Sequence, residues 1–322
     1  MRNIAIVAGG DSSEFEVSVR SADGVKDALS KLYNTYVIMI RGTNWFWEDQ
    51  KGRYFNIDKN NFTLKVGDDI IRFDAVFIAI HGKPGENGLL QGYFDMLGIK
   101  YTTCGVFSSA LTFNKQATKA FLKEYGIAMA EAEMIKKGEE INAKAILHKT
   151  GLPCFVKPND SGSSVGVSKI KSESEFLPAV EKAFGESDTV MIESFMEGRE
   201  VACGVVKSKN RKLVLPVTEI ISKNEFFDYE AKYTPGRSEE VTPAKMDDKI
   251  TEEIQRLSSV IYDLLDCRGI VRVDFIVVRN KPLFLEINTV PGMTEESLVP
   301  QQAKAAGISL TDFYSMVIED LF

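Results

Sequence analysis

The side chains best suited to chemistry gather in one apolar segment near the end of the chain. Two apolar runs there flank a turn at Asn280, a pattern that predicts a β-hairpin. Alternate residues of a strand share a face. Arg272 and Asp274 therefore share one face of the first strand, and Glu286 and Asn288 share one face of the second. A hairpin that pivots at Asn280 sets Asp274 opposite Glu286. It also sets Arg272 opposite Asn288, so that all four side chains point the same way. A slip of one residue would put the two pairs on opposite faces.

Three oxygen donors and a guanidinium on one strand face allow two interpretations. Carboxylate and amide oxygens are ligands that Mg²⁺ takes, usually together with phosphate oxygens and water. An arginine beside them could neutralise charge that develops on a phosphorylated intermediate. The alternative is an exposed hairpin face with a structural salt bridge. The company of the motifs below favours the metal-binding interpretation.

A run of small residues, 161–166, follows Lys157. Small residues let backbone N–H groups close around phosphate oxygens. A P-loop would have its lysine after the glycines and then a helix, whereas here the lysine comes first and a strand is expected next. We therefore predict a flexible phosphate-covering hairpin that contains Ser163 and Ser164, with Lys157 at its base. An ordinary Gly-Ser hairpin is the alternative.

A third segment, residues 193–200, carries acidic side chains around an apolar pair at the end of an expected strand. The pair is Phe195 and Met196, and the acidic residues include Glu193 and Glu200. Backbone groups of such a linker can bind an adenine edge, and a carboxylate can accept hydrogen bonds from ribose hydroxyls. A solvated loop is the alternative.

The elements that must position these groups start with alternating strands and a helix. Strands are expected at 4–7, 36–40 and 75–80, with a helix that Ser12 or Ser13 caps and that runs to about Leu29. This alternation predicts a parallel sheet with a binding crevice at its strand ends, although the dinucleotide fingerprint GxGxxG is absent. Further helices are expected at 89–97, 114–125, 174–184 and 248–265. From about Pro153 short strands alternate with turns, at 154–157, 165–170, 190–193, 201–206 and 213–221. Residues 222–246 lack periodicity, and a loop of that length is usually functional or disordered.

The composition is that of an ordinary globular protein. The 322 residues are 44% hydrophobic and 26% charged, which suits two or three packed subdomains. The formal net charge of -7 argues against general nucleic-acid binding. We expect no secretory signal and no membrane helix, because the apolar runs are too short. The four cysteines form no CxxC pair, and two histidines are too few for a histidine-rich metal centre.

The three motifs, in this order, resemble the ATP-grasp superfamily, and their details resemble the D-alanine–D-alanine ligases. Five further stretches support the closer resemblance, which runs nearly end to end: 9–18, 81–88, 114–115, 228–233 and 291–300. The resemblance implies an α/β (α+β overall) ATP-grasp fold. A Rossmann-like parallel-sheet domain would span 1–103, and two α+β subdomains, 104–192 and 193–322, would hold ATP between them.

The resemblance also implies how ATP is held. Lys115 and Lys157 would bind its phosphates, under the hairpin with Ser163 and Ser164. The adenosine would be bound by Glu193, Phe195, Met196 and Glu200, with Phe226 and Leu285 packed on the adenine. Asp274, Glu286 and Asn288 would bind two Mg²⁺ ions, for which Mn²⁺ can substitute. A lid, residues 226–244, would bring Lys232 to the γ-phosphate.

The implied substrates are two D-alanines. Glu16 would anchor the ammonium of the first, with His81 nearby, and Arg272 with the Gly292 N–H would form an oxyanion site. Ser297, with Leu298 behind it, would hold the carboxylate of the second. Tyr233 would hydrogen-bond toward Ser163 and Glu16.

The implied reaction joins the two D-alanines through a D-alanyl phosphate and releases ADP and phosphate, for peptidoglycan precursor synthesis. A bacterial cytoplasmic location and a homodimer are expected, without nucleic-acid or membrane partners. One alternative is a D-alanine–D-lactate ligase, although those enzymes usually have histidine where this chain has Tyr233. Another is a non-catalytic ATP-binding regulator of the same fold, which would be expected to lose Arg272 or the metal ligands.

Overall fold

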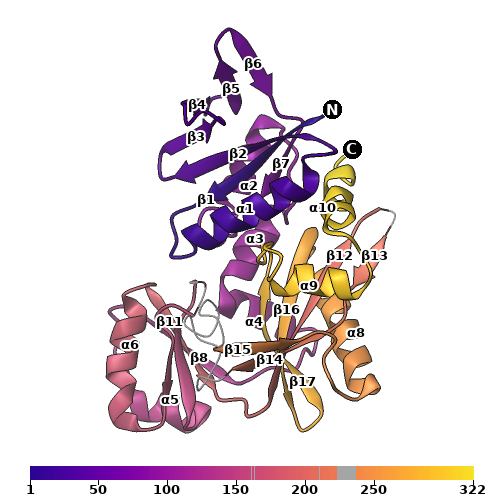
Figure 1. The fold of residues 1–322 in the computed structure, drawn as a ribbon. Helices are drawn as coiled ribbons and strands as arrows, with labels where there is room; N and C mark the ends of the chain where they lie inside the picture. The colour runs from indigo at the N-terminus through magenta and orange to yellow at the C-terminus, as the bar shows by residue number, and fades with distance from the viewer. Residues whose placement is uncertain (161, 163, 210, 223–236) are drawn as a thin grey trace.

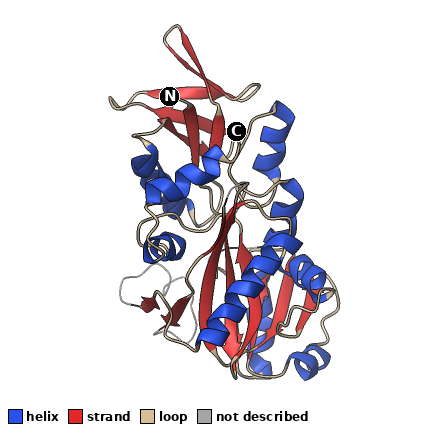
Figure 2. Cartoon of the chain, turned by 90° about the vertical axis from the view of Figure 1, so that its right-hand side faces the viewer, coloured by secondary structure: helices blue, strands red, loops and turns tan. Residues whose placement is uncertain are grey.

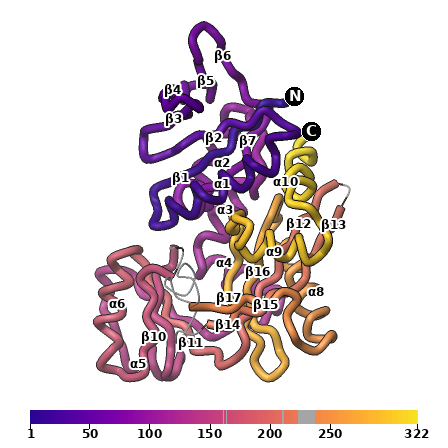
Figure 3. Tube along the Cα trace, viewed as in Figure 1, coloured from indigo at the N-terminus to yellow at the C-terminus, as the bar shows by residue number. Residues whose placement is uncertain are grey.

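The computed structural model describes every residue of the chain except 161, 163, 210 and 223–236. Three sheets with helices against them give the molecule its shape, one sheet at one end and two at the other (Figure 1). The two ends of the chain lie close together at the N-terminal sheet (Figure 3), where Arg2 Nη1 lies 2.9 Å from Glu319 Oε2. No helix in the described part of the chain has both the length and the apolar character that a membrane crossing demands.

The N-terminal sheet has the predicted parallel centre. Strand β1 (Asn3–Gly9) lies between β2 (Asn34–Arg41) and β7 (Ala75–Ile78) and is parallel to both. Helices α1 (Phe15–Leu29) and α2 (Leu89–Leu97) belong to this half of the chain. An antiparallel meander that the sequence did not predict extends the sheet through β3 (Asn44–Glu48), β4 (Tyr54–Asp58), β5 (Thr63–Val66) and β6 (Asp69–Arg72). The C-terminal helix α10 (Leu310–Glu319) packs against α1 and shares its core.

The second sheet is small and wholly antiparallel. Its order is β10 (Ser168–Ile170), β9 (Cys154–Pro158), β11 (Thr189–Ser194) and β8 (Ala132–Lys136). A 3₁₀ turn, η1 (Glu173–Glu175), leads into α6 (Phe176–Phe184), which packs with α5 (Ala143–Thr150) on the apolar face of this sheet. Strands β9 and β10 are antiparallel partners, so they form the strands of the expected hairpin, whose role in covering phosphate stays a prediction.

The third sheet has one buried face and one face toward the cavity described below. Its order is β15 (Ser238–Val241), β14 (Thr218–Ser222), β12 (Arg199–Lys207), β16 (Gly269–Val278) and β17 (Lys281–Asn288), and β13 (Lys212–Val214) also pairs with β12. Helix α8 (Asp248–Leu264) packs along its buried face, and the turned view shows helices beside these long strands (Figure 2). Odd-numbered residues of β12 and β16 form this core: Val201, Cys203, Val205, Val271, Val273, Phe275 and Val277. Strand alternation therefore turns the even-numbered residues, Arg272 and Asp274 among them, to the other face.

The β16–β17 hairpin has the predicted residue pairing, but it also contains a β-bulge that was not predicted. Arg279 and Asn280 have φ angles of 48° and 64°, as expected for a two-residue hairpin turn. That turn pairs Phe275 with Phe284, and in a regular ladder Asp274 would then face Leu285. A β-bulge at this point leaves Leu285 as the extra residue, so that Asp274 faces Glu286. Arg272 likewise faces Asn288, and the four side chains share one face as predicted.

Other boundaries differ from expectation. The expected strand 213–221 is two strands, β13 and β14. Helix α1 starts at Phe15 after Glu14, and Ser12 does not cap it directly but accepts a hydrogen bond from the Glu14 N–H at 3.2 Å. Helices α3 (Val106–Phe113) and α4 (Lys115–Lys123) contribute to the core of the third sheet. The division of the chain at 103/104 and 192/193 stays a prediction.

Candidate active site

A cavity of about 1140 Å³ lies between the three sheets. Its volume lies just above the range of about 300–1,000 Å³ that is typical of small-molecule and cofactor sites. Most predicted site residues line it: His81, Lys115, Lys157, Ser164, Glu193, Phe195, Met196, Glu200, Arg272, Leu285, Glu286, Asn288, Gly292, Ser297 and Leu298. Four others, Ser163, Phe226, Lys232 and Tyr233, lie outside the described residues. Glu16 and Asp274 do not line the cavity.

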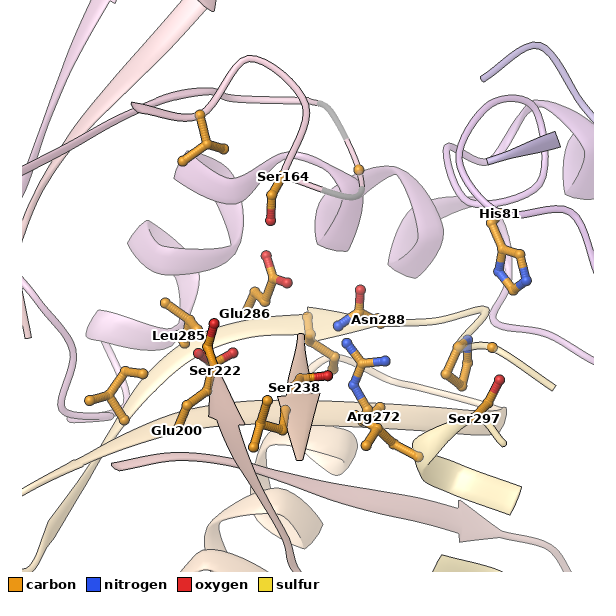
Figure 4. Close-up of a pocket in the computed structure, with 18 of the residues that line it drawn as sticks. His81, Ser164, Glu200, Ser222, Ser238, Arg272, Leu285, Glu286, Asn288 and Ser297 are labelled. Atoms are coloured by element: carbon orange, nitrogen blue, oxygen red, sulfur yellow. The ribbon is translucent and has the colours of Figure 1, made fainter. Parts of the chain in front are cut away.

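Asp274 is buried directly beneath Arg272. The Arg272 Nε and Nη2 atoms lie 2.8 Å and 2.7 Å from the two carboxylate oxygens of Asp274, and Asn288 Nδ2 lies 3.0 Å from Oδ2. Figure 4 shows Glu286, Asn288 and Arg272 side by side on the floor of the pocket, with Ser164 on the opposite wall. The described residues hold no group of three or more His, Cys, Asp or Glu suited to a metal. A cation here would take two carboxylates and one amide, a set typical of Mg²⁺ that is completed by phosphate and water.

Two buried lysines converge on Glu193. Lys157 Nζ lies 2.6 Å from Glu193 Oε2, and Lys119 pairs with Oε1. Burial alone would raise the pKa of Glu193, but the two ammonium groups hold it below its usual value. The strand end therefore presents a fixed, ionised acceptor beside Phe195. Lys119 was not predicted, although it follows Lys115 by one turn of α4 and so shares its face.

The start of α4 is tied to the end of β9. The Asn114 side chain caps the helix by accepting from the Ala117 N–H at 2.9 Å. The Lys115 N–H donates to the Asn159 carbonyl at 3.1 Å, and the Gln116 N–H to the Asn159 side chain at 2.9 Å. These bonds hold Lys115 on the same wall of the cavity as Lys157.

The structure places Glu16 away from the cavity. Glu16 lies exposed in the first turn of α1, whereas Glu14 lines the cavity. The difference follows from the start of α1. Glu14 precedes the first turn and lines the cavity, whereas Glu16 lies within the first turn and is exposed to solvent. A Cβ on Gly162 would clash with Glu14 Oε2, so Gly162 lies directly against this carboxylate.

His81 holds the loop that carries Gly292. Its Nδ1 lies 2.7 Å from the Val290 carbonyl oxygen, and its Nε2 lies 2.9 Å from Ser21 Oγ. A carbonyl only accepts, so Nδ1 carries the proton and Nε2 accepts from Ser21. The Ser21 oxygen in turn accepts from the Met293 N–H at 3.2 Å. Burial lowers the pKa of His81 and so favours this neutral form.

Glu86 binds the same loop, and together with His81 and Ser21 it forms a clamp on residues 290–293. Its carboxylate accepts from the Gly82 N–H at 2.7 Å and from the Val290 N–H at 3.1 Å. Burial, followed by the charge of Glu14, raises the pKa of Glu86 to about 8. Two residues of the segment between β7 and α2 thus bind both the N–H and the carbonyl of Val290.

Ser297 closes the far end of the site. It precedes α9 (Leu298–Ala305), and its hydroxyl accepts from the Thr294 N–H at 3.2 Å. A Cβ at Gly292 would lie 2.6 Å from Ser297 Oγ, so a side chain at this position would have to displace that hydroxyl. Leu298 packs with Ala202 and Ile220 on the open face of the third sheet.

Comparison with known proteins gives matches along the whole chain. The pattern of the D-ala D-ala ligase N-terminus matches residues 3–104, and that of the D-ala D-ala ligase C-terminus matches residues 121–319. A D-alanine–D-alanine ligase of Phocaeicola vulgatus is 48% identical, over 100% of this chain and 99% of the relative. One of Flavobacterium johnsoniae is 49% identical, over 99% of each.

Solved structures agree with this. The D-alanyl-alanine synthetase A of Vibrio cholerae superposes with a TM-score of 0.89 at 27% identity, covering 99% of this chain and 98% of that one. The VanG D-Ala:D-Ser ligase of Enterococcus faecalis gives 0.87 at 31% identity, covering 100% and 99%. The predicted ATP-grasp fold is confirmed, and the chain belongs to the D-alanine–D-alanine ligase family.

Proposed function

We propose that this protein joins two D-alanines to D-alanyl-D-alanine at the expense of ATP, through a D-alanyl phosphate. The observation that carries the proposal is that most of the motif residues line one cavity. The N-terminal and C-terminal patterns of the family match the two parts of the chain that form this cavity. The relatives from Phocaeicola vulgatus and Flavobacterium johnsoniae are D-alanine–D-alanine ligases, which favours the dipeptide over a depsipeptide product.

ATP is assigned to the wall between the second and third sheets. The adenine would lie by Phe195, Met196 and Leu285, with Glu193 as a hydrogen-bond acceptor for its amino group. The Leu285 bulge adds an apolar contact on this side without turning Glu286 away. Glu200 is assigned to the ribose hydroxyls, and Lys115 and Lys157 to the phosphates. The ammonium of Lys157 is paired with Glu193. On phosphate binding, it would either contact both groups or move from Glu193 to the phosphate.

Mg²⁺ fits the face of the β16–β17 hairpin. Asp274, Glu286 and Asn288 would hold it, and the bound metal would neutralise triphosphate charge and polarise the transferred phosphoryl group. Arg272 now occupies both oxygens of Asp274, so metal binding would free its guanidinium toward the substrate.

The first D-alanine is assigned to the space between Glu14 and Arg272. Its ammonium is assigned to Glu14, which lines the cavity, rather than to Glu16, which does not. Arg272 and the Gly292 N–H would stabilise the oxyanion of the tetrahedral intermediate. His81 would act by positioning Gly292, because both of its ring nitrogens are bonded within the protein. Ser297 and Leu298 are assigned to the second D-alanine.

The chemistry follows from the poor reactivity of a carboxylate. An oxygen of the first D-alanine carboxylate attacks the γ-phosphorus, and the bond to ADP breaks. The neutral amine of the second D-alanine then attacks the carbonyl carbon of the acyl phosphate. The tetrahedral intermediate collapses with loss of phosphate, and the amine gives up a proton. Exclusion of water protects the acyl phosphate from hydrolysis.

We also keep as proposals the predicted roles of Ser163, Phe226, Lys232 and Tyr233, the lid 226–244 and the cytoplasmic location.

A homodimer is also proposed. Helices α2 and α3 expose Leu89, Met96 and Phe107, which are 66%, 83% and 68% exposed. Leu89 and Met96 are seven residues apart and share one helix face, so this surface is a candidate interface. Light scattering on the wild type and on Met96→Glu tests it: a dimer that dissociates supports this face.

The experiment that tests the function is amino-acid-dependent ATP turnover. Phosphate release should require D-alanine, fail with L-alanine, stop with EDTA and resume with excess Mg²⁺. ATP hydrolysis that is indifferent to D-alanine would contradict ligation.

A further inference from the structure

Glu240 is a carboxylate of the cavity, in the part of the proposed lid 226–244 that forms strand β15. It lies on β15, where it pairs with Ile220 of β14, and Ile220 pairs with Glu200 of β12. Cross-strand partners share a face, so Glu240 and Glu200 belong to the same open face of the third sheet. Both residues line the cavity.

The surroundings of Glu240 are those of the second-substrate pocket. Ala202, Ile220 and Leu298 form a small apolar cluster that serves as its floor. Gln301 Nε2 donates to Glu240 Oε2 at 2.7 Å, and Gln301 lies one turn after Ser297 on the side of α9 that reaches the sheet. Glu240 and Ser297 thus stand near the same apolar floor, one on the sheet and one at the start of α9.

Within the described part of the chain, hydrogen bonds satisfy only part of the Glu240 carboxylate. In the described ranges, Gln301 is the hydrogen-bond donor that the structure gives it, and this bond uses one of its two oxygens. Burial raises the pKa of Glu240, while the Gln301 bond and the charge of Arg272 act against this rise. A half-buried carboxylate of this kind is stabilised by a cationic ligand.

We propose that Glu240 binds the ammonium group of the second amino acid and thereby favours an amine over a hydroxyl as the acceptor. The inference rests on the proposed function, since it supplies the partner for a substrate assigned to this pocket. A small zwitterion fits the arrangement: its carboxylate at Ser297, its methyl group on the floor and its ammonium at Glu240. A hydroxy acid such as D-lactate has no positive charge, so it gains nothing from Glu240.

The test is competition between acceptors for one acyl phosphate. With ATP and D-alanine fixed, D-lactate or D-serine is added, and products are quantified by mass spectrometry. The ratio of products reports only the second site, because both acceptors attack the same intermediate. In Glu240→Gln, D-Ala–D-Ala relative to D-Ala–D-lactate should fall about tenfold or more, the size expected for loss of a hydrogen bond to a charged group.

The ratio of D-Ala–D-Ala to D-Ala–D-Ser should stay constant in the same variant, because both acceptors carry an ammonium. Glu239→Gln is the matched control: Glu239 neighbours Glu240 on β15 but is exposed on the other face. It should match the wild type in both ratios, as should the KM for ATP in all variants. Glu240→Asp, which keeps the charge but shortens the side chain, should give an intermediate lactate ratio.

The outcomes separate the two proposals. A wild type that makes no dipeptide defeats the proposed function itself. A wild type that makes dipeptide, with Glu240→Gln indistinguishable from Glu239→Gln, defeats only the role of Glu240. If Glu240→Gln fails to fold by thermal melting, the Glu240→Asp ratio decides, and a wild-type ratio there overturns the inference.

Discussion

His81 Nδ1 lies 2.7 Å from the carbonyl oxygen of Val290, a residue 209 positions later in the chain. This bond joins the end of β7 to the loop that presents the Gly292 N–H. Ser21 and Glu86 bind the same loop through Met293 N and Val290 N. Three side chains of the N-terminal part thus hold the loop of the C-terminal part on both sides of Gly292, at Val290 and at Met293.

Ser21→Ala should slow turnover by about tenfold, because the Met293 N–H and His81 Nε2 both lose their partner and Gly292 is held less firmly. The loss of a buried hydrogen bond should also lower the free energy of unfolding by about 1–3 kcal/mol. Steady-state kinetics and denaturant titration measure the two effects. Ser13→Ala, at an exposed site, is the control, and equal kcat values for the two variants would contradict the clamp.

Glu86 should make stability depend on pH. Its pKa rises from 4.5 to about 8 on folding, so the folded state favours the protonated acid. Its contribution to stability is therefore full below pH 4.5 and is lost as pH rises through about 8. The difference in unfolding free energy between the wild type and Glu86→Gln should shift against the wild type over this range. A difference that is constant with pH would show that Glu86 is ionised in the folded state throughout.

Lys119→Ala should damage both stability and ATP binding. It leaves the buried Glu193 carboxylate with one cation in place of two, and breaking a buried ion pair typically costs about 3–5 kcal/mol. Lys157 would then be held more tightly by Glu193, and the KM for ATP should rise. Lys123→Ala, one turn later on α4 and exposed, should leave both quantities unchanged. Matching values for the two variants would remove Lys119 from the site.

Arg272→Ala should reduce turnover by about 100-fold or more while ATP binding is largely kept, because the guanidinium is assigned to charge that develops during reaction. Its removal also frees Asp274, so metal binding should not weaken. Single-turnover kinetics and nucleotide titration separate the two effects. Near-normal ligation by this variant would defeat the oxyanion assignment.

The sequence predicted the chemical face of the site because strand alternation and the apolar core of β16 leave little freedom. It could not predict the Leu285 bulge. The two-residue turn sets a ladder in which Asp274 would face Leu285, whereas the observed pairing of Asp274 with Glu286 needs one extra residue in β17. The sequence contains no signal for the position of that extra residue. The predicted pairing is confirmed because a pivot at Asn280 gives the same partners for Arg272 and Asp274 as the observed two-residue turn followed by the bulge.

Residues whose roles depend on long-range contact were missed. Glu14 and Glu16 differ by two positions, and only the observed start of α1 decides which one faces the cavity. Lys119 acquires a partner 74 positions away, and Glu240 sits on a short strand in a segment without periodicity. The meander β3–β6 was missed because its strands are short and mostly half-exposed.

The central claim is tested most directly by the identity of the product made from ATP, Mg²⁺ and D-alanine, with D-lactate added at an equal concentration. Mass spectrometry should show D-alanyl-D-alanine as the main product near neutral pH, with one phosphate released for each peptide bond. D-alanyl-D-lactate as the main product, or ATP binding without any product, would contradict the account.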